Sequence, residues 1–231
     1  MPKFNRQFIG YEYPNETTLK QNVYYKYNKL GHRCKNVEEI NLDDYILFAG
    51  CSHTLGEALT LEYTFPYVTS KNLNCDYYNL AVPATGIDVV FYNLMMWFAL
   101  YKPPKMVVLQ YPDYARFSCS VPNSPLVVPH GPWESDIDII DMMMKSEDKG
   151  LYSFRNTCYL QLLNNIIKVP LIKIVFGQTK SIDSDAIRIH KVDYAVDNQH
   201  YGPETHSIVA DILCDKYKNA AIHSTFRGKS E

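Results

Sequence analysis

The sequence predicts an α/β fold, a three-layer α/β/α sandwich around a parallel, flavodoxin-like sheet of five strands. Short, continuous apolar runs alternate along the chain with longer stretches of helical periodicity. Continuous apolar runs are typical of strands buried on both faces, and their alternation with helices is typical of parallel sheets. The composition agrees, because 46% hydrophobic and 21% charged residues in 231 describe an ordinary globular chain of one domain.

Residues 1–43 differ from the rest of the chain. They are polar and aromatic with weak periodicity, so we expect an irregular N-terminal extension that packs on the domain. The domain itself is expected to span 44–231. Its first strand is the apolar run 45–50, a stretch with helical potential follows at 56–72 around Pro66, and 77–82 is the second strand.

The middle of the chain continues the alternation. The dense apolar segment 87–101 is expected to be a helix, which Pro103 and Pro104 end. The third strand is expected at 105–111. Residues 118–135 are rich in proline and predict a long loop, which we consider a substrate wall or lid together with Phe117 and Trp133.

The last third supplies the remaining elements. Helices are expected at 136–147 and 151–168, followed by a fourth strand at 170–176 and a short fifth strand near 186–189. The final helix is expected at 203–217. It begins at Pro203, since proline is favoured where its missing N–H would have no partner in the helix.

Composition also limits the classes of partner and of chemistry. A formal net charge of -2 gives no basic face, so we expect no nucleic-acid partner. No run approaches the ~20 apolar residues of a membrane-spanning helix, and the N-terminus lacks an apolar signal segment. The chain is therefore expected to be cytoplasmic or an intracellular, virus-encoded protein. None of the six cysteines forms a CxxC pair, so we expect mostly free thiols and no structural zinc.

The residues that follow each strand are where chemistry is expected, because ligands of a parallel sheet bind outside the carboxyl ends of its strands. Ser52 follows the first strand, and Asp197 and His200 form an Asp-x-x-His just before the last helix. Each has a plainer reading alone, since a serine after a strand is commonly a helix N-cap and Asp-x-x-His is commonly a solvated turn. Together, and in this order, they indicate a Ser-His-Asp set.

These blocks resemble those of the SGNH hydrolases, also called the GDSL esterase/lipase family, over roughly residues 24–217. The family's Gly-Asp-Ser block, which carries the nucleophile, is similar to Gly50-Cys51-Ser52, with Cys51 in place of the aspartate. The family's late Asp-x-x-His block is intact as Asp197 and His200. The resemblance implies an ester hydrolase in which Ser52 is the nucleophile, His200 the base and Asp197 the residue that orients it. It implies no cofactor.

The resemblance also implies an oxyanion hole built from the backbone N–H groups of Ser52 and Ala81 and the side chain of Gln110. Ala81 stands where the family usually has the glycine of an Asn-x-Gly stretch. The family's third block usually reads Gly-x-Asn-Asp, whereas this chain has Gln110-Tyr111-Pro112-Asp113 and no asparagine. Two readings of Gln110 stay open, its amide as the replacement donor and a merely structural role. Loss of such a donor typically lowers kcat by roughly 10²–10³.

The chemistry of the three residues is consistent with that role. A serine hydroxyl is a weak nucleophile that needs a base, and an imidazole can accept and return its proton near neutral pH. A buried carboxylate fixes the ring tautomer and stabilises the imidazolium. The i, i+3 spacing of Asp197 and His200 lets a single turn present both side chains on one side.

The sequence leaves the substrate and several alternative functions open. We expect a small-molecule or carbohydrate ester, with a short acyl chain because no broad apolar lid helix is visible. The same site would serve an O-acyltransferase. The altered third block and Cys51 also allow a non-catalytic binding module on the same fold. A metal-dependent hydrolase using Asp197, His200, His206 and His190 has no supporting ligand spacing, so no metal is expected. His53 is expected to be structural or to line the substrate, and Arg116 to be a surface charge. The sequence does not indicate an oligomeric state.

Overall fold

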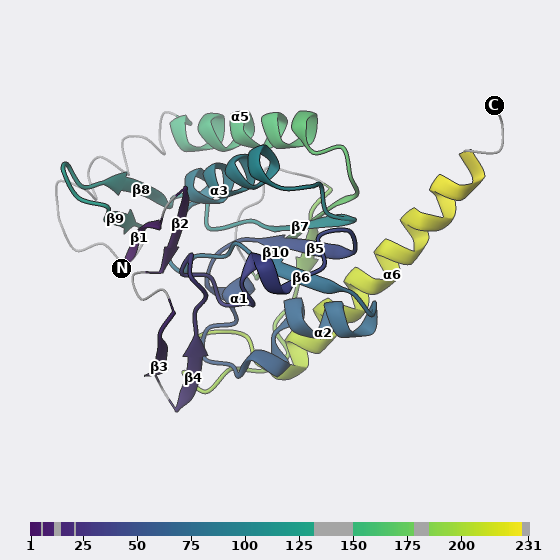
Figure 1. The fold of residues 1–231 in the computed structure, drawn as a ribbon, viewed down its shortest axis with the longest axis horizontal. Coiled ribbons are helices and arrows are strands. Elements are labelled where there is room, and N and C mark those ends of the chain that lie inside the picture. Colours follow the sequence, from purple (N-terminus) through teal and green to yellow (C-terminus); the bar gives the residue numbers. More distant parts are fainter. Residues whose placement is uncertain (6, 12–14, 21, 132–149, 178–184, 228–231) are drawn as a thin grey trace.

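A computed structural model of the chain describes residues 1–5, 7–11, 15–20, 22–131, 150–177 and 185–227. Its centre is one sheet of five parallel strands in the order β11-β10-β7-β5-β6 (Figure 1). The strands are β5 (Tyr45–Ala49), β6 (Asp76–Asn79), β7 (Met106–Gln110), β10 (Leu171–Phe176) and β11 (Ile187–Ile189). Numbered along the chain this order is 2-1-3-4-5, the flavodoxin-like arrangement. The predicted fold class is confirmed.

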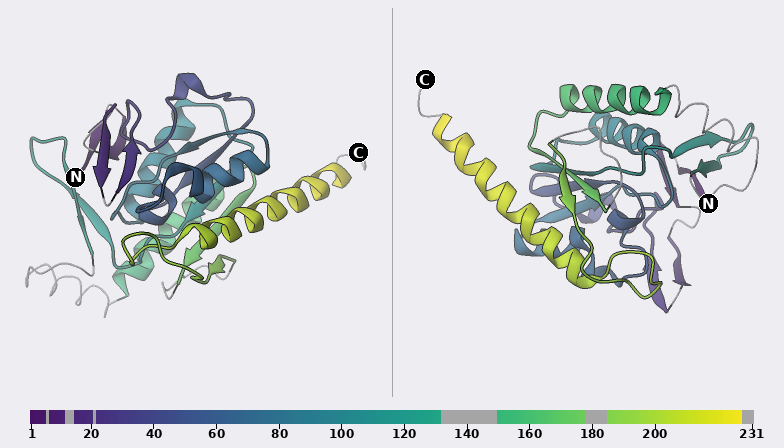
Figure 2. Two further views of the ribbon diagram at one scale, coloured as in Figure 1. Left: turned by 90° about the horizontal axis from the view of Figure 1, so that it is seen from below. Right: turned by 180° about the vertical axis from the view of Figure 1, so that it is seen from behind.

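Helices cover both faces of the sheet (Figures 1 and 2). The elements α3 (Ile87–Leu100) and α5 (Leu151–Ile166) lie on one face, and α2 (Phe65–Asn72) and α6 (Pro203–Arg227) on the other. Side chains of β5 point alternately to the two layers: Tyr45 and Leu47 pack in the core under α3 and α5, whereas Ile46 and Phe48 pack under α2 and α6. Because both faces are buried, this strand is apolar at every position.

Two stretches around the sheet differ from the expectation. The segment 56–72 is not one helix but is divided between η2 (Leu61–Tyr63) and α2, after the short α1 (Ser52–Leu55). Gly56 ends α1 in a left-handed conformation, with φ of 77°. Pro66 stands in the first turn of α2, where its missing N–H leaves no helical hydrogen bond unmade. The second strand was expected to reach residue 82, but β6 ends at Asn79.

The predicted long loop at 118–135 is wrong over its described part. β8 (Phe117–Ser120) and β9 (Val127–His130) pair as an antiparallel hairpin. A two-stranded hairpin has only edge strands, and an edge strand tolerates proline, so Pro129 does not prevent pairing. The expected helix at 136–147 and Trp133 lie outside the described residues.

The N-terminal extension is also more regular than predicted. It contains two antiparallel hairpins, formed by β1 (Pro2–Asn5) with β2 (Phe8–Tyr11) and by β3 (Thr17–Lys20) with β4 (Val23–Lys26), and a single turn of 3-10 helix, η1 (Val37–Glu39). The first hairpin joins α3 because the buried Asn93 side chain accepts from Ile9 N at 2.9 Å and donates to Ile9 O at 2.8 Å. Such fully satisfied buried amides fix the position of an edge strand.

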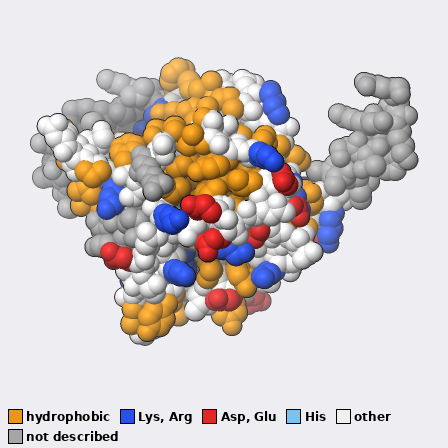
Figure 3. Space-filling model, viewed as in Figure 1, with side chains coloured by type: hydrophobic (Ala, Val, Ile, Leu, Met, Phe, Trp, Pro, Cys, Tyr) orange, Lys and Arg blue, Asp and Glu red, His pale blue; other side chains and the backbone are white. Residues whose placement is uncertain are grey.

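The cysteines, the helices and the surface can be compared with the expectations from the sequence. All six cysteines are free thiols, as expected. Among the described residues, no helix has the length and apolar character needed to cross a membrane. Apolar side chains gather over the upper half of the face shown in Figure 3. α6 begins beside the sheet and extends away from the body of the molecule (Figure 1).

Candidate active site

Ser52 lies at the carboxyl end of β5, where the chain turns sharply into α1. Gly50 permits this turn: a Cβ at that position would lie 2.3 Å from Thr54 Oγ1 and 2.7 Å from Gln110 Oε1. Ser52 is the first residue of α1 and is 6% exposed. Its backbone N–H is one of the first N–H groups of a helix, which have no acceptor within the helix. The local sequence thus places a serine hydroxyl and a helix start at the edge of the sheet.

Asp197 and His200 lie in a closed loop that leads into α6. The carboxylate of Asp197 accepts the backbone N–H groups of Gln199 and His200, each at 3.0 Å. Its second oxygen is 2.5 Å from Nδ1 of the His200 ring. A backbone bond from Ala195 N to His200 O, at 2.9 Å, closes the loop. The i, i+3 spacing therefore brings acid and imidazole together.

The protonation of this pair follows from its surroundings. Burial alone would raise the pKa of Asp197, but hydrogen bonds from His200 and Gln199 outweigh it, so the pKa lies below its ordinary value. Asp197 is therefore an ionised acceptor at neutral pH, and Nδ1 of His200 carries the proton that it binds. The remaining nitrogen, Nε2, is left to exchange protons with a substrate or nucleophile.

Nε2 of His200 faces Glu57 rather than Ser52 in this structure. The distance from Nε2 to Oε2 of Glu57 is 3.7 Å. Among the residues that the structure describes, no hydrogen bond joins Ser52 Oγ to the His200 ring. Yet the two sides of the site are close, because Glu57 N donates to Ser52 O at 3.0 Å. Catalytic hydrogen bonds are often long without substrate and tighten when it binds.

The residues expected to form the oxyanion hole make other hydrogen bonds here. Ala81 N donates to Asn79 Oδ1 at 3.1 Å. Gln110 is 2% exposed, and its amide nitrogen donates to Tyr111 O at 2.5 Å. Its amide oxygen accepts from Cys51 N at 2.8 Å and from Thr54 Oγ1 at 3.1 Å. Gln110 thus supports the turn that carries Ser52, and its role as a donor to an oxyanion stays a prediction.

His53 forms the floor of the site beside His200. Its ring stacks on Phe176 with centroids 4.6 Å apart, and the centroid of the His200 ring lies 5.2 Å away. Burial is the main reason that the pKa of His53 is well below its ordinary value, and the charges of His200, His206 and Arg116 lower it further. His53 is therefore a neutral aromatic group that packs against His200.

Other side chains considered from the sequence occupy structural positions. His206 is buried and accepts the backbone N–H of Phe65 through Nδ1 at 3.0 Å, which anchors α2 to α6. Arg116 approaches the site, with Nη1 3.5 Å from Cys51 Sγ. Among the described residues, no group of three or more His, Cys, Asp or Glu side chains could hold a metal ion.

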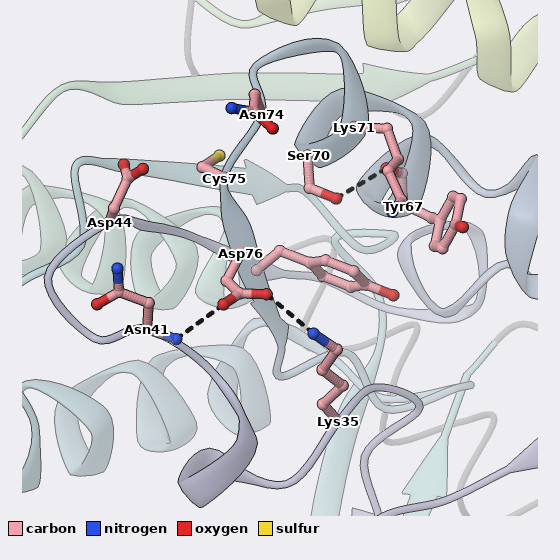
Figure 4. Close-up of a pocket in the computed structure, with 10 residues that line it drawn as sticks. Lys35, Asn41, Asp44, Tyr67, Ser70, Lys71, Asn74, Cys75 and Asp76 are labelled. Carbon is pink, nitrogen blue, oxygen red and sulfur yellow. Dashed lines mark hydrogen bonds and ion pairs between the residues drawn. The ribbon is translucent and has the colours of Figure 1, made fainter.

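A polar cavity lies away from this site, at the opposite, amino-terminal edge of the sheet (Figure 4). It has a volume of about 340 Å³ and is bordered by Asp44, which precedes β5, and by Asp76 and Tyr77, which begin β6. The carboxylate of Asp76 is already bound there, by Lys35 Nζ at 3.1 Å and by Asn41 N at 2.8 Å. This cavity is separated from Ser52 by the length of the strands and belongs to a different part of the molecule.

Sequence reasoning missed two residues of the site, Glu57 and Lys20. The ammonium of Lys20 on β3 forms an ion pair with the carboxylate of Glu57. This hydrogen bond is the main cause of the raised pKa of Lys20. Neither residue stands in a motif, and their partners are distant in the chain. Only the five-residue separation of Glu57 from Ser52 could have drawn attention to it.

Comparisons with known proteins find no matching family model and no matching curated protein. Similar solved structures include a carbohydrate esterase whose active site displays divergent catalytic and non-catalytic binding functions (14% identity, TM-score 0.45, 76% of this chain and 65% of that chain). Others are an acetyl xylan esterase from Butyrivibrio proteoclasticus (13%, 0.45, 77% and 64%) and a family two carbohydrate esterase from Clostridium thermocellum (14%, 0.44, 78% and 65%). The chain spans about 65% of the length of these proteins.

Proposed function

We propose that this protein is a serine ester hydrolase of the SGNH type, acting on short-chain or carbohydrate O-acyl esters. Ser52 is the nucleophile, His200 the general base and acid, and Asp197 the residue that orients His200. The observation that carries the proposal is the 2.5 Å hydrogen bond between Asp197 Oδ2 and His200 Nδ1. It stands on the same edge of the sheet as a serine that begins a helix, which is the edge where α/β folds bind ligands.

The proposed reaction proceeds in two halves. Ser52 Oγ bonds to the ester carbonyl carbon as its proton passes to Nε2 of His200. The bond to the alcohol oxygen then breaks, and the Nε2 proton moves to that oxygen. Water attacks the acyl-serine in the second half: its proton passes to Nε2, and this proton returns to Ser52 Oγ as the acid leaves. Asp197 stays ionised throughout and stabilises the imidazolium.

The backbone N–H of Ser52 is the proposed oxyanion donor that needs no rearrangement. Ala81 N–H would first have to leave Asn79 Oδ1, and the Gln110 amide would have to leave Tyr111 O. Removing one donor of an oxyanion hole typically lowers kcat by roughly 10²–10³. The proposed enzyme is accordingly slow, unless substrate binding releases these donors.

A non-catalytic binding module is the second candidate. Two observations favour it. Nε2 of His200 lies beside Glu57, and the proposed donors of Ala81 and Gln110 already make other hydrogen bonds. A module that only binds needs neither a poised base nor an oxyanion hole. An O-acyltransferase would use the proposed residues and differ only in its acyl acceptor. It is distinguished by product analysis, in which the acyl group is found on an added alcohol instead of in the free acid.

The test is intact mass spectrometry after incubation with a fluorophosphonate, which traps activated serines. We expect one adduct on the wild type and on Ser120→Ala, an exposed serine of β8 that serves as the control, and none on Ser52→Ala. Chromogenic acetate and octanoate esters then measure the chain-length preference. A folded wild type that acquires no adduct would refute the hydrolase and leave the binding module. An adduct that persists on Ser52→Ala would place the nucleophile elsewhere.

A further inference from the structure

The Glu57 carboxylate lies 3.7 Å from Nε2 of His200, the nitrogen that delivers the proton to the leaving alcohol in the proposed mechanism. Glu57 lies one residue beyond the glycine that ends α1, and its backbone N–H donates to Ser52 O at 3.0 Å. The proposed nucleophile and the Glu57 carboxylate are thus carried by one tight turn. That turn keeps the backbone of Glu57 next to the backbone of Ser52.

The side chain of Glu57 is held in place from two sides. One oxygen pairs with the ammonium of Lys20, which comes from the β3–β4 hairpin of the N-terminal extension. The other oxygen lies 3.7 Å from Nε2 of His200. A polar contact of that length leaves space for another group beside it, as with bridging water. Glu57 is therefore an anchored acceptor that borders the proton-transfer path.

The two carboxylates around His200 differ in their access to solvent. The Asp197 side chain is 3% exposed, whereas those of Glu57 and His200 are 16% and 20% exposed. The Asp197 carboxylate is enclosed, and its oxygens accept hydrogen bonds from Gln199 and His200 of the same loop. Glu57 opens toward the surface on the side of Nε2, from which a substrate must approach.

The geometry of proton delivery then defines what Glu57 can bind. The leaving oxygen must come within about 2.6–3.2 Å of Nε2 to receive its proton. Atoms attached next to that oxygen consequently lie beside the Glu57 carboxylate. An ionised carboxylate only accepts hydrogen bonds, so its complement in a substrate is a hydroxyl. A simple alkyl group there would leave Oε2 of Glu57 without a hydrogen-bond partner, which is costly, although Oε1 stays paired with Lys20.

We propose that Glu57, held by Lys20, is a specificity-determining residue that binds a hydroxyl on the alcohol part of the ester. The site accordingly selects esters of polyhydroxy alcohols over esters of simple alcohols. This inference rests on the proposed function. It specifies that the alcohol part of the substrate is recognised, and that Glu57 and Lys20 recognise it.

The test compares two esters that share an acetyl group and a three-carbon alcohol, glycerol 1-acetate and propyl acetate. The readout is the ratio of their kcat/KM values for the full chain. We expect the wild type to favour glycerol 1-acetate and Glu57→Met, which has no strong acceptor, to lose about 10-fold of that preference. Glu57→Gln keeps an acceptor and retains most of it. Lys20→Met, which frees the carboxylate, lowers it in part. Glu62→Gln, an exposed carboxylate variant in η2, leaves it unchanged.

Each outcome separates this inference from the proposed function. Fluorophosphonate labelling of Ser52 in the Glu57→Met protein shows that the nucleophile is still active, and thermal unfolding shows that the variant is folded. An unchanged ratio in Glu57→Met, with labelling intact, overturns the specificity role while leaving the hydrolase standing. Equal loss of both esters also overturns it, since Glu57 would then act on the base. A wild type that neither labels nor hydrolyses either ester refutes the proposed function and the inference with it.

Discussion

Replacement of Arg33 by methionine tests how the N-terminal extension supports the turn that carries Ser52. Arg33 is 1% exposed, and its guanidinium donates to Gly56 O at 2.6 Å and to Leu59 O at 2.7 Å. It also donates to Leu55 O at 3.3 Å and lies over the Tyr25 ring, 4.3 Å from its centroid. A single buried side chain thus binds the carbonyl of the last residue of α1 and two carbonyls of the segment that follows it.

The magnitude follows from what the carbonyls lose. Gly56 O also accepts Leu59 N at 3.2 Å, but no other described residue donates to Leu55 O or Leu59 O. Leaving two buried carbonyls without donors costs about 1–3 kcal/mol each, or about 2–6 kcal/mol together. Burial lowers the pKa of Arg33, so the charge itself is costly to bury, and its removal recovers part of that amount. We expect Arg33→Met to lower the free energy of unfolding by about 3 kcal/mol.

Urea unfolding followed by circular dichroism measures this change. The control is Lys29→Met, which removes an ion pair to Glu38 whose side chains are 50% and 66% exposed. Exposed pairs contribute about 0–1 kcal/mol, so the control should unfold close to the wild type. If Arg33→Met unfolded within 0.5 kcal/mol of the Lys29→Met control, roughly the scatter of surface substitutions, the reasoning would be refuted.

Two further predictions concern protons. Asp197→Asn should lower the kcat for ester hydrolysis by roughly 10³–10⁴ with little change in KM, because the amide can hold His200 in the wrong tautomer; steady-state kinetics would contradict this if kcat fell less than about ten-fold. Burial lowers the pKa of His206 to about 3, so the unfolded chain binds a proton that the folded one refuses, and stability falls as the pH drops from about 6.5 toward 3. At pH 5 this contribution is about 2 kcal/mol, and His206→Gln should lose that much less stability than the wild type between pH 7 and pH 5 in urea unfolding; parallel losses would refute it.

The parallel sheet could be predicted because strands that are buried on both faces appear in the sequence as short continuous apolar runs. β5 and β7 are buried at every position. The β3–β4 hairpin was missed for the opposite reason. In β4 the buried Val23 and Tyr25 alternate with Tyr24 and Lys26, and an exposed tyrosine hides the period of two. Hydrophobicity alone cannot distinguish the two faces of such a strand.

The site shows the same division between local and distant order. The Asp197–His200 pair could be predicted because three residues and one turn suffice to join the side chains. The environment of Nε2 could not, since it depends on Glu57 and on Lys20, which meet only when the extension docks on the domain. Gln110 is the intermediate case. Its position at a strand end was predictable, but the strand register decides which groups its amide meets.

The N-terminal extension and the edge of the sheet that carries Ser52 are consequently coupled through one short segment. Residues 55–59 receive the Arg33 guanidinium, and Ala58 N donates to the Tyr25 hydroxyl at 2.6 Å. The same segment carries Glu57, which takes its anchor from Lys20. A turn as short as α1 has little stability of its own, because helix nucleation is unfavourable and its packing surface is small. The rigidity that the proposed nucleophile requires therefore comes in part from residues 1–43, through the contacts of Arg33, Tyr25 and Lys20 with this segment.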